Sequence, residues 1–241
     1  MKVRRKKGSG ALSLTSLIIG LSVLLSLTGC DSGSPKAESS TGTDRSTAAK
    51  EELVLAVGKM DGGQFDPKKG WGMTQIRLTH SSLLTIDADL NFVGDLAESY
   101  STSEDGLTWT FPLRDDAKFS NGERVTAEDV KFTYDMLQED GIKFDLTFVR
   151  SVEAAEDNTV VIRLNEPRST FVSQLTEIGI VPQAHYDDRY SDNPIGSGPY
   201  KAVQYDDGQQ VILEYNPYWY GKEPQFKKLT FLLLAEDAAL A

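Results

Sequence analysis

Residues 103–122 read SEDGLTWTFPLRDDAKFSNG and contain the clearest structural pattern of the chain. Within this stretch the residues of 108–113 alternate in character, so that Trp109, Phe111 and Leu113 share one face of an extended strand. Two aromatic rings and a leucine on one face are typical of a strand that covers a hydrophobic core. The sequence therefore predicts a half-buried strand here.

A turn and a helix are expected directly after this strand. Residues 120–123 read SNGE, which is turn chemistry. Thr126 is followed three residues later by Asp129, a pairing that caps helix N-termini. Apolar residues then recur at helical spacing as far as Leu137, and Gly141 is suited to end the helix.

Several further elements are predicted on both sides of this region. The apolar run Leu53–Val57 is expected to be a strand that is covered on both faces. The sequence also predicts hairpins that pair 149–154 with 159–164 and 200–205 with 210–215, a strand over 228–234, and helices over 73–84, over 169–177 with Ser169 as cap, and from 235 on. This irregular mixture indicates an α/β fold with mixed α+β character.

The N-terminal region has the layout of a secretory signal. Residues 1–29 begin with five positive charges, continue with an apolar run over 11–27, and end in Leu-Thr-Gly before Cys30. This order resembles the cleavage site of bacterial lipoproteins and implies that Cys30 is lipidated; a chance cysteine after an ordinary signal is the alternative. Residues 30–50 are small, polar and charged, which predicts a disordered tether of about 25 Å.

Composition excludes some partners. The net charge is −11, and removal of the five positive charges of 1–29 would leave the mature chain near −16. Such a surface repels nucleic acid, and it makes the lipid on Cys30 the membrane anchor. His80 and His185 are too few and too isolated to predict a zinc site, so no metal site is expected.

Known catalytic signatures are missing from the sequence. It has no Gly-x-Ser-x-Gly elbow, no His-Glu-x-x-His pair and no cysteine nucleophile. The adjacent Asp115 and Asp116 point apart at a strand end and make a poor acid–base pair. Residues 196–198 read GSG without the lysine of a phosphate-binding loop, and are interpreted as a tight turn. We therefore expect no enzyme activity, no catalytic residue and no cofactor.

Six segments together resemble the family 5 extracellular solute-binding proteins, the dipeptide, oligopeptide and nickel receptors of ABC importers. These segments occur in the order and at the spacing of that family, and the resemblance covers Leu53 to the end of the chain. They are Asp95–Tyr100, Ser103–Phe111, Leu113–Gly122, Thr126–Val130, Pro194–Tyr200 and Asn216–Trp219. Most of these residues have the character of fold-defining turns and core positions rather than ligand contacts.

The resemblance implies a fold of the periplasmic-binding-protein type II kind, with residues 51–241 as the N-terminal part of a solute-binding domain. About 53–95 plus 194–241 would form an incomplete first lobe, and about 96–193 an added subdomain. The second lobe would be missing, because the chain ends at Ala241 about where that lobe is expected to start. We therefore expect a truncated receptor: a fragment, a frameshifted gene or a shortened version.

Three candidate ligand contacts follow from the resemblance. The cleft of the family is approached by the loop after the first strand and by the end of a short helix, here 70–73 and 176–179. Trp71 is either a stacking contact for ligand or an anchor of its loop. Met73 matches a methionine of nickel receptors across an uncertain gap. Glu177 lies near the position at which nickel receptors carry an arginine. No arginine matches here, which favours a ligand with a positive group over a nickel chelate.

The resemblance implies a lipid-anchored receptor that captures peptides for the permease subunits of an ABC importer at the extracytoplasmic face of the cell membrane. We expect it to be a monomer with a small solute as ligand. A nickel or metal-chelate receptor of the same family is one alternative. A non-transport signalling or adhesive lipoprotein on the same fold is an alternative of another class.

Overall fold

A computed structural model of the chain describes residues 51–57, 65–68, 76–140, 144–206 and 208–234. All of them belong to one of the two units into which the chain divides, and the other unit, Gly8–Lys50, lies outside these ranges. The predicted signal peptide, the tether and the helix from 235 on are therefore outside the described residues. Within the described ranges, no helix combines the length and the apolar character needed to cross a bilayer.

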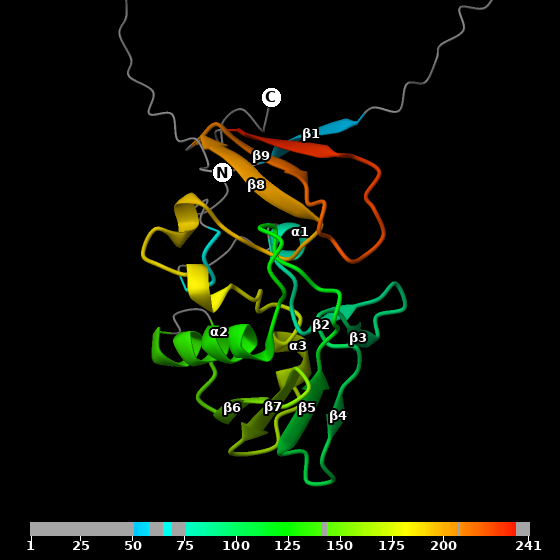
Figure 1. The fold of residues 1–241 in the computed structure, drawn as a ribbon, viewed down its shortest axis with the longest axis vertical. Helices are drawn as coiled ribbons and strands as arrows, with labels where there is room; N and C mark the ends of the chain where they lie inside the picture. Colours follow the sequence, from blue (N-terminus) through cyan, green and yellow to red (C-terminus); the bar gives the residue numbers. More distant parts are fainter. Residues whose placement is uncertain (1–50, 58–64, 69–75, 141–143, 207, 235–241) are drawn as a thin grey trace, which may run out of the picture. The chain divides into compact units, whose positions relative to one another are not determined.

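One four-stranded sheet joins the first strand to the last part of the chain (Figure 1). In spatial order it consists of β1 (Glu52–Val57), β10 (Lys228–Leu233), β9 (Gln210–Tyr215) and β8 (Tyr200–Asp206). β1 runs parallel to β10, and the other neighbours are antiparallel. We call this the mixed sheet. The predicted β8–β9 hairpin and the strand at 228–234 are confirmed.

A second sheet is antiparallel throughout and is drawn at the bottom of Figure 1. In spatial order it consists of β4 (Ser101–Thr102), β5 (Thr108–Pro112), β7 (Thr159–Leu164) and β6 (Val149–Ala155). We call it the antiparallel sheet. On β5 Phe111 is fully buried, and Trp109 packs edge-on against the Phe171 ring at 5.5 Å. The strand predicted from the opening stretch is therefore confirmed, as is the β6–β7 hairpin.

The predicted capped helix is α2 (Ala127–Asp140), which packs on β6 and β7. The Thr126 hydroxyl donates to the Asp129 carboxylate at 2.7 Å, and the Thr126 backbone N–H donates to the same oxygen at 2.9 Å. This arrangement satisfies groups at the start of the helix that would otherwise lack partners. The cap is therefore confirmed, whereas Gly141 lies outside the described residues.

The helix predicted over 73–84 is wrong for most of its described length. The structure has a single turn, α1 (Ile76–Thr79), followed by irregular backbone and then by β2 (Leu84–Ile86). Backbone groups distant in sequence bind the intervening carbonyls: Leu96 N–H donates to Ser82 O at 3.0 Å. These tertiary bonds override the local helical pattern.

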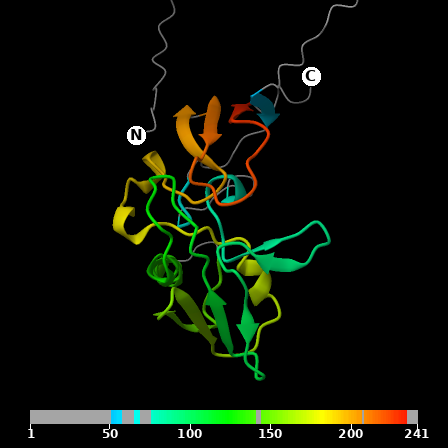
Figure 2. The same cartoon turned by 45° about the vertical axis from the view of Figure 1, so that its right-hand side comes forward.

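β2 pairs with β3 (Phe92–Gly94) in a short hairpin that projects to the right in Figure 2. A turn lies between the two strands. The Asp87 carboxylate accepts backbone N–H groups from Asp89 and Asn91, at 2.9 and 2.8 Å, and these bonds hold the turn.

Three short helical segments connect the antiparallel sheet to the mixed sheet. They are α3 (Phe171–Gln174) and the 3-10 turns η1 (Gln183–His185) and η2 (Tyr190–Asp192). The short helix predicted over 169–177 is present in part, as α3 and a turn that continues to Glu177, but Ser169 does not cap it. The residue before α3 is Thr170, it makes no side-chain cap, and the buried ring of Phe171 fixes the turn instead.

The expectation that β1 is covered on both faces is also wrong. β1 lies at the edge of the mixed sheet, where among the described strands it pairs only with β10. Val54 is 53% exposed and Leu55 37% exposed. Leu53 and Val57 are the β1 side chains that pack against the core of this sheet, and both are only partly buried. The apolar run correctly predicted a strand, but it did not predict that this strand lies at the edge of its sheet.

The conformation of residues 196–198 is determined by their close approach to another backbone segment rather than by turn geometry. A Cβ at Gly196 would lie 1.9 Å from Thr79 O, and one at Gly198 would lie 2.7 Å from the Thr79 carbonyl carbon. The Gly198 N–H donates to Thr79 O at 2.9 Å. The interpretation as a simple tight turn is therefore corrected: the two glycines let this strand entry lie against the backbone that follows α1.

We expect Gly198→Ala to lower the free energy of unfolding by about 2–3 kcal/mol, because its methyl group would overlap backbone atoms that are themselves hydrogen-bonded. Urea denaturation measures the change. The control is Gly208→Asn, at a turn position with open space and positive φ that asparagine tolerates, with an expected change within about 0.5 kcal/mol. Equal stability of Gly198→Ala and the parent protein would contradict the close approach.

Candidate functional site

Of the predicted site residues, the structure describes only Glu177. Cys30, Trp71 and Met73 lie outside the described residues. Glu177 follows α3, its side chain is exposed, and its backbone N–H donates to Gln174 O at 3.0 Å. Among the described residues it has no ion-pair partner. Its neighbours Thr176 and Ile178 are buried, so the backbone on both sides of Glu177 is held inside the protein.

The segment that holds Glu177 in place belongs to a network of polar groups, of which Asp95 and Tyr220 are partly buried and the others are buried. We call this network the polar junction. It comprises Thr79, His80, Ser81, Ser82, Asp95, Thr176, Tyr190, Ser197 and Tyr220. Polar groups this deeply buried are tolerated only when they are hydrogen-bonded, so each contact in the network also fixes the position of a chain segment.

Residues 81 and 82 connect three segments of the chain through backbone and hydroxyl groups. The Ser82 hydroxyl donates to Thr176 O at 3.3 Å, and the Ile180 N–H donates to Ser81 O at 3.0 Å. On the opposite side, the Ser81 N–H donates to the Ser197 hydroxyl oxygen at 3.3 Å. The loop that bears Glu177 is thereby tied to the entry of the mixed sheet.

His80 is buried, and its ring is oriented on both nitrogens. Tyr190 donates its single hydroxyl proton to Ile195 O at 2.7 Å, so this hydroxyl accepts from His80 Nε2, also at 2.7 Å. His80 Nδ1 is then the acceptor for the Thr79 hydroxyl at 2.9 Å. Burial lowers the pKa of His80 from 6.5 to about 3, so the ring is neutral at pH 7.

Asp95 is the charged group of the polar junction. The Tyr220 hydroxyl donates to one of its carboxylate oxygens, and the Ser82 N–H donates to the other at 3.2 Å. The Arg114 guanidinium lies 4.0 Å above the Tyr220 ring and is paired with Asp116 at 2.6 Å. Burial raises the pKa of Asp95, and the bonds from Tyr220 and Ser82 oppose that shift. Burial also raises the pKa of Tyr220.

The reactive groups of the polar junction are engaged in hydrogen bonds that hold chain segments together. The Ser81 hydroxyl bonds to Ser197 O and to the Tyr220 hydroxyl, and both His80 nitrogens are engaged elsewhere. Asp115 pairs with Arg124 and Asp116 pairs with Arg114, so the two neighbouring carboxylates have different partners. Across the described ranges, no three His, Cys, Asp or Glu side chains are close enough together to hold a metal ion. The arrangement holds the loop at 176–179 against the backbone at 81–82.

Sequence reasoning did not find the polar junction. One signal was available: residues 79–82 read THSS between apolar residues, an unusual run of four small or polar side chains. Asp95 and Tyr220 lie at or beside segments that carry the family resemblance, yet nothing local links one to the other. His80 is buried in the polar junction, and His185 lies on the surface beside Glu123.

The sequence profile of the bacterial extracellular solute-binding proteins, family 5 (middle region), matches residues 91–241. This match covers more than half of the chain and includes all of the antiparallel sheet and β8, β9 and β10 of the mixed sheet. The chain belongs to this family. A family 5 member was expected from the motif segments, and that expectation is confirmed.

Two curated relatives support the same assignment. A Brucella ovis protein assigned as an ABC transporter peptide-binding protein is 36% identical over 193 residues, which is 73% of this chain and 36% of the relative. An Escherichia coli K12 protein assigned as a D,D-dipeptide-binding periplasmic protein is 34% identical over 213 residues, or 80% of this chain and 41% of the relative. The chain thus spans about two fifths of the length of these relatives.

A solved structure gives the fold. The Campylobacter jejuni protein NikZ, in complex with Ni(L-His), matches with a TM-score of 0.68 and 27% identity over 77% of this chain and 39% of that protein. The mixed α/β architecture of this family 5 chain is therefore part of a periplasmic-binding-protein type II fold, as predicted.

The buried neutral His80 makes stability depend on pH in a defined direction. Its pKa is about 3 in the folded state and near 6.5 in the unfolded state, so between these values only the unfolded chain takes up the proton. The free energy of unfolding should therefore be highest above pH 6.5 and fall by about 2 kcal/mol between pH 7 and pH 5. Urea denaturation at several pH values measures this fall.

His80→Gln should lose most of this fall, while His185→Gln, on the surface, should retain it. The pH range stops at 5 so that titration of ordinary carboxylates contributes little. A His80→Gln protein with the same pH dependence as the parent would show that another group causes it.

Proposed function

We propose that this family 5 chain is part of a lipid-anchored receptor that captures peptides at the extracytoplasmic face of the membrane for an ABC importer. The observation that carries the proposal is the similarity of 34–36% identity to two relatives assigned as peptide-binding and D,D-dipeptide-binding proteins. The receptor performs no chemistry in this proposal; it binds a small solute and presents it to permease subunits.

The described structure supports a binding role through the loop at 176–179. The polar junction fixes this loop from inside, so Glu177 is presented on a rigid backbone with its carboxylate exposed. A fixed carboxylate suits the amino group of a peptide, because a preorganised ion pair costs little further ordering on binding. We propose Glu177, Trp71 and Met73 as ligand contacts.

We further propose that the mixed sheet belongs to the first lobe of the receptor and the antiparallel sheet to an added subdomain. In this arrangement a second lobe completes the cleft and closes on the ligand by a hinge motion. A cleft of this kind buries a ligand on both sides, which is the main source of affinity in such sites.

A metal chelate is the second candidate ligand, favoured by one observation. The matching NikZ structure holds Ni(L-His), at an identity lower than that of the peptide-binding relatives. The two candidates differ in charge at the recognised group: a peptide offers an ammonium, while a chelate offers carboxylates. Glu177 favours the ammonium.

We expect trialanine with a free amino terminus to raise the melting temperature of the receptor purified from its own cells, because a ligand that binds only the folded state stabilises it. Glu177→Gln should weaken trialanine binding by up to about fivefold, the effect of about one exposed charge pair. Glu166→Gln, an exposed glutamate before α3, serves as the matched control. Calorimetric titration gives the affinities.

N-acetylated trialanine and Ni(L-His) separate the two ligand classes. The peptide proposal requires that acetylation abolish most of the effect of Glu177. A melting-temperature rise with Ni(L-His) and none with trialanine would replace it with the chelate.

We expect Cys30→Ser to move the protein from the membrane fraction to the soluble extracytoplasmic fraction, because a diacyl or triacyl anchor provides the membrane affinity in this proposal. Cell fractionation followed by mass measurement of the N-terminal peptide tests this. Ser34→Ala, four residues further along the tether, is the control and should remain in the membrane fraction. Membrane retention of Cys30→Ser would rule out the lipid anchor.

A further inference from the structure

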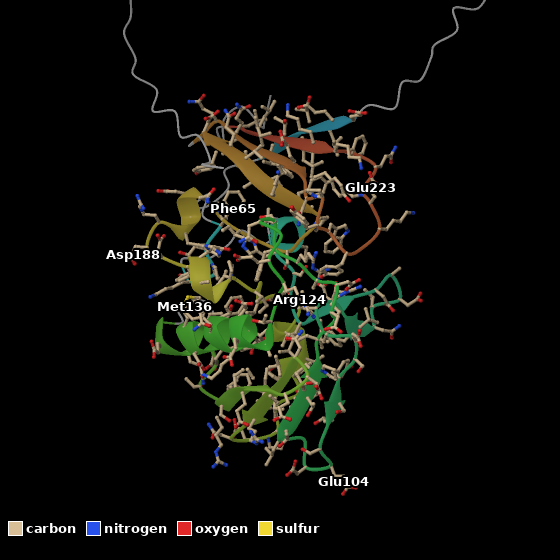
Figure 3. All side chains as sticks on the ribbon, viewed as in Figure 1. Phe65, Glu104, Arg124, Met136, Asp188 and Glu223 are labelled. Carbon is tan, nitrogen blue, oxygen red and sulfur yellow. The ribbon has the colours of Figure 1, made fainter. Side chains whose placement is uncertain are left out.

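A groove of about 510 Å³ lies beside α2, and Tyr186 in its lining packs on Tyr190 of the polar junction at 5.1 Å. One wall is α2, and the other is the segment 183–188, with Lys68 between them. The apolar part of its lining consists of Phe132, Met136 and Tyr186. In Figure 3, Met136 and Asp188 are labelled on this side of the protein. The volume lies within the range of about 300–1,000 Å³ that is usual for binding sites.

The two walls are fixed to each other by specific contacts. The Gln183 N–H donates to Asp129 Oδ1 at 2.9 Å, and the Val181 N–H donates to the Thr133 hydroxyl oxygen at 3.2 Å. The rings of Phe132 and Tyr186 meet edge-on at 5.5 Å across the groove floor. The groove is therefore preformed, and a segment that binds in it does not have to order the walls.

The charge around the groove is strongly one-sided. Five carboxylates and two ammonium groups line it, and one of the ammonium groups, Lys131, is already paired with Asp135 within α2. Glu128 and Glu139 lie near opposite ends of α2 and are exposed. An apolar floor between acidic rims is complementary to a segment that combines basic and apolar side chains.

We propose that this groove docks a short segment of a partner protein that carries at least two Lys or Arg side chains beside apolar ones. Glu128 and Glu139 are eleven positions apart, which corresponds to about 16 Å along the helix. An extended segment of about five residues spans that length. Its basic side chains reach the acidic rims, and an arginine can also lie against the ring of Phe132 or Tyr186. Glu177 does not line this groove, so variants at Glu177 and at the acidic rims test the two proposals separately.

The test uses a fluorescently labelled heptapeptide of alternating Arg and Leu, acetylated and amidated so that it offers no terminal charge to a peptide-binding cleft. Fluorescence anisotropy with the purified full-length receptor gives its affinity at low and at moderate salt. We expect saturable binding that weakens as salt rises, because exposed charges are screened.

The deciding variant is Glu128→Lys with Glu139→Lys. In the first and last turns of α2 the two changes have opposite effects through the helix dipole, so the fold should be preserved. We expect at least about a tenfold loss of affinity, since two exposed pairs are replaced by repulsions. The matched control is Glu104→Lys with Glu156→Lys, at two exposed turns of the antiparallel sheet; Glu104 is labelled at the far end in Figure 3. It changes the net charge equally and should leave the affinity unchanged.

Three results would overturn the proposal. Equal losses in both double variants would mean that only the overall negative charge of the protein attracts the peptide. Equal affinity for a peptide with Ser in place of Leu would mean that the apolar floor is not used. Displacement of the peptide by spermidine at micromolar concentration would make a small polyamine the occupant.

Discussion

The hydrogen bond from Gly198 N–H to Thr79 O marks the constraint on which the rest of the described structure depends. It requires two backbones, separated by more than a hundred residues, to lie closer than a side chain would allow. Because the strand entry at 196–198 is held there, the irregular backbone at 79–82 cannot continue as a helix. Its carbonyls are then available to Leu96 and Ile180. Hydrogen bonds to the backbone at 79–82 thus link the entry of the mixed sheet to Leu96 and Ile180.

The buried polar groups at this connection stabilise it and also fix one arrangement of the chain segments that meet there. An apolar interface could slide, whereas His80, Ser81 and Asp95 each accept only partners in fixed positions. The cost is electrostatic. Burial forces His80 to stay neutral and raises the pKa of Asp95, and the hydroxyls of Tyr190 and Tyr220 offset part of that cost. The loop at 176–179 is thereby held in one position relative to the entry of the mixed sheet.

The parts of the fold that sequence predicted well are those decided by neighbours along the chain. β5 follows from the alternation around Phe111, and the β6–β7 hairpin follows from the turn residues Asp157 and Asn158, which both adopt positive φ. The cap at Thr126 is likewise local. The failures are non-local: the bonds that end α1 come from distant segments, and no pattern in β1 reveals that it lies at a sheet edge. The site was harder still, since Asp95 and Tyr220 are joined only in space, and Glu177 was suggested by family resemblance alone.

The parallel pairing of β1 with β10 also orders the events of folding. Glu52 pairs with Lys228, so the first strand made has no partner until nearly the whole described chain has followed it. By contrast, β5, α2, β6 and β7 are close in sequence and need little loop closure to meet. Val54 and Leu55 therefore remain exposed to other chains until β10 has been made. The rate at which β10 arrives, rather than the strength of the finished sheet, then sets how long the nascent protein depends on chaperones.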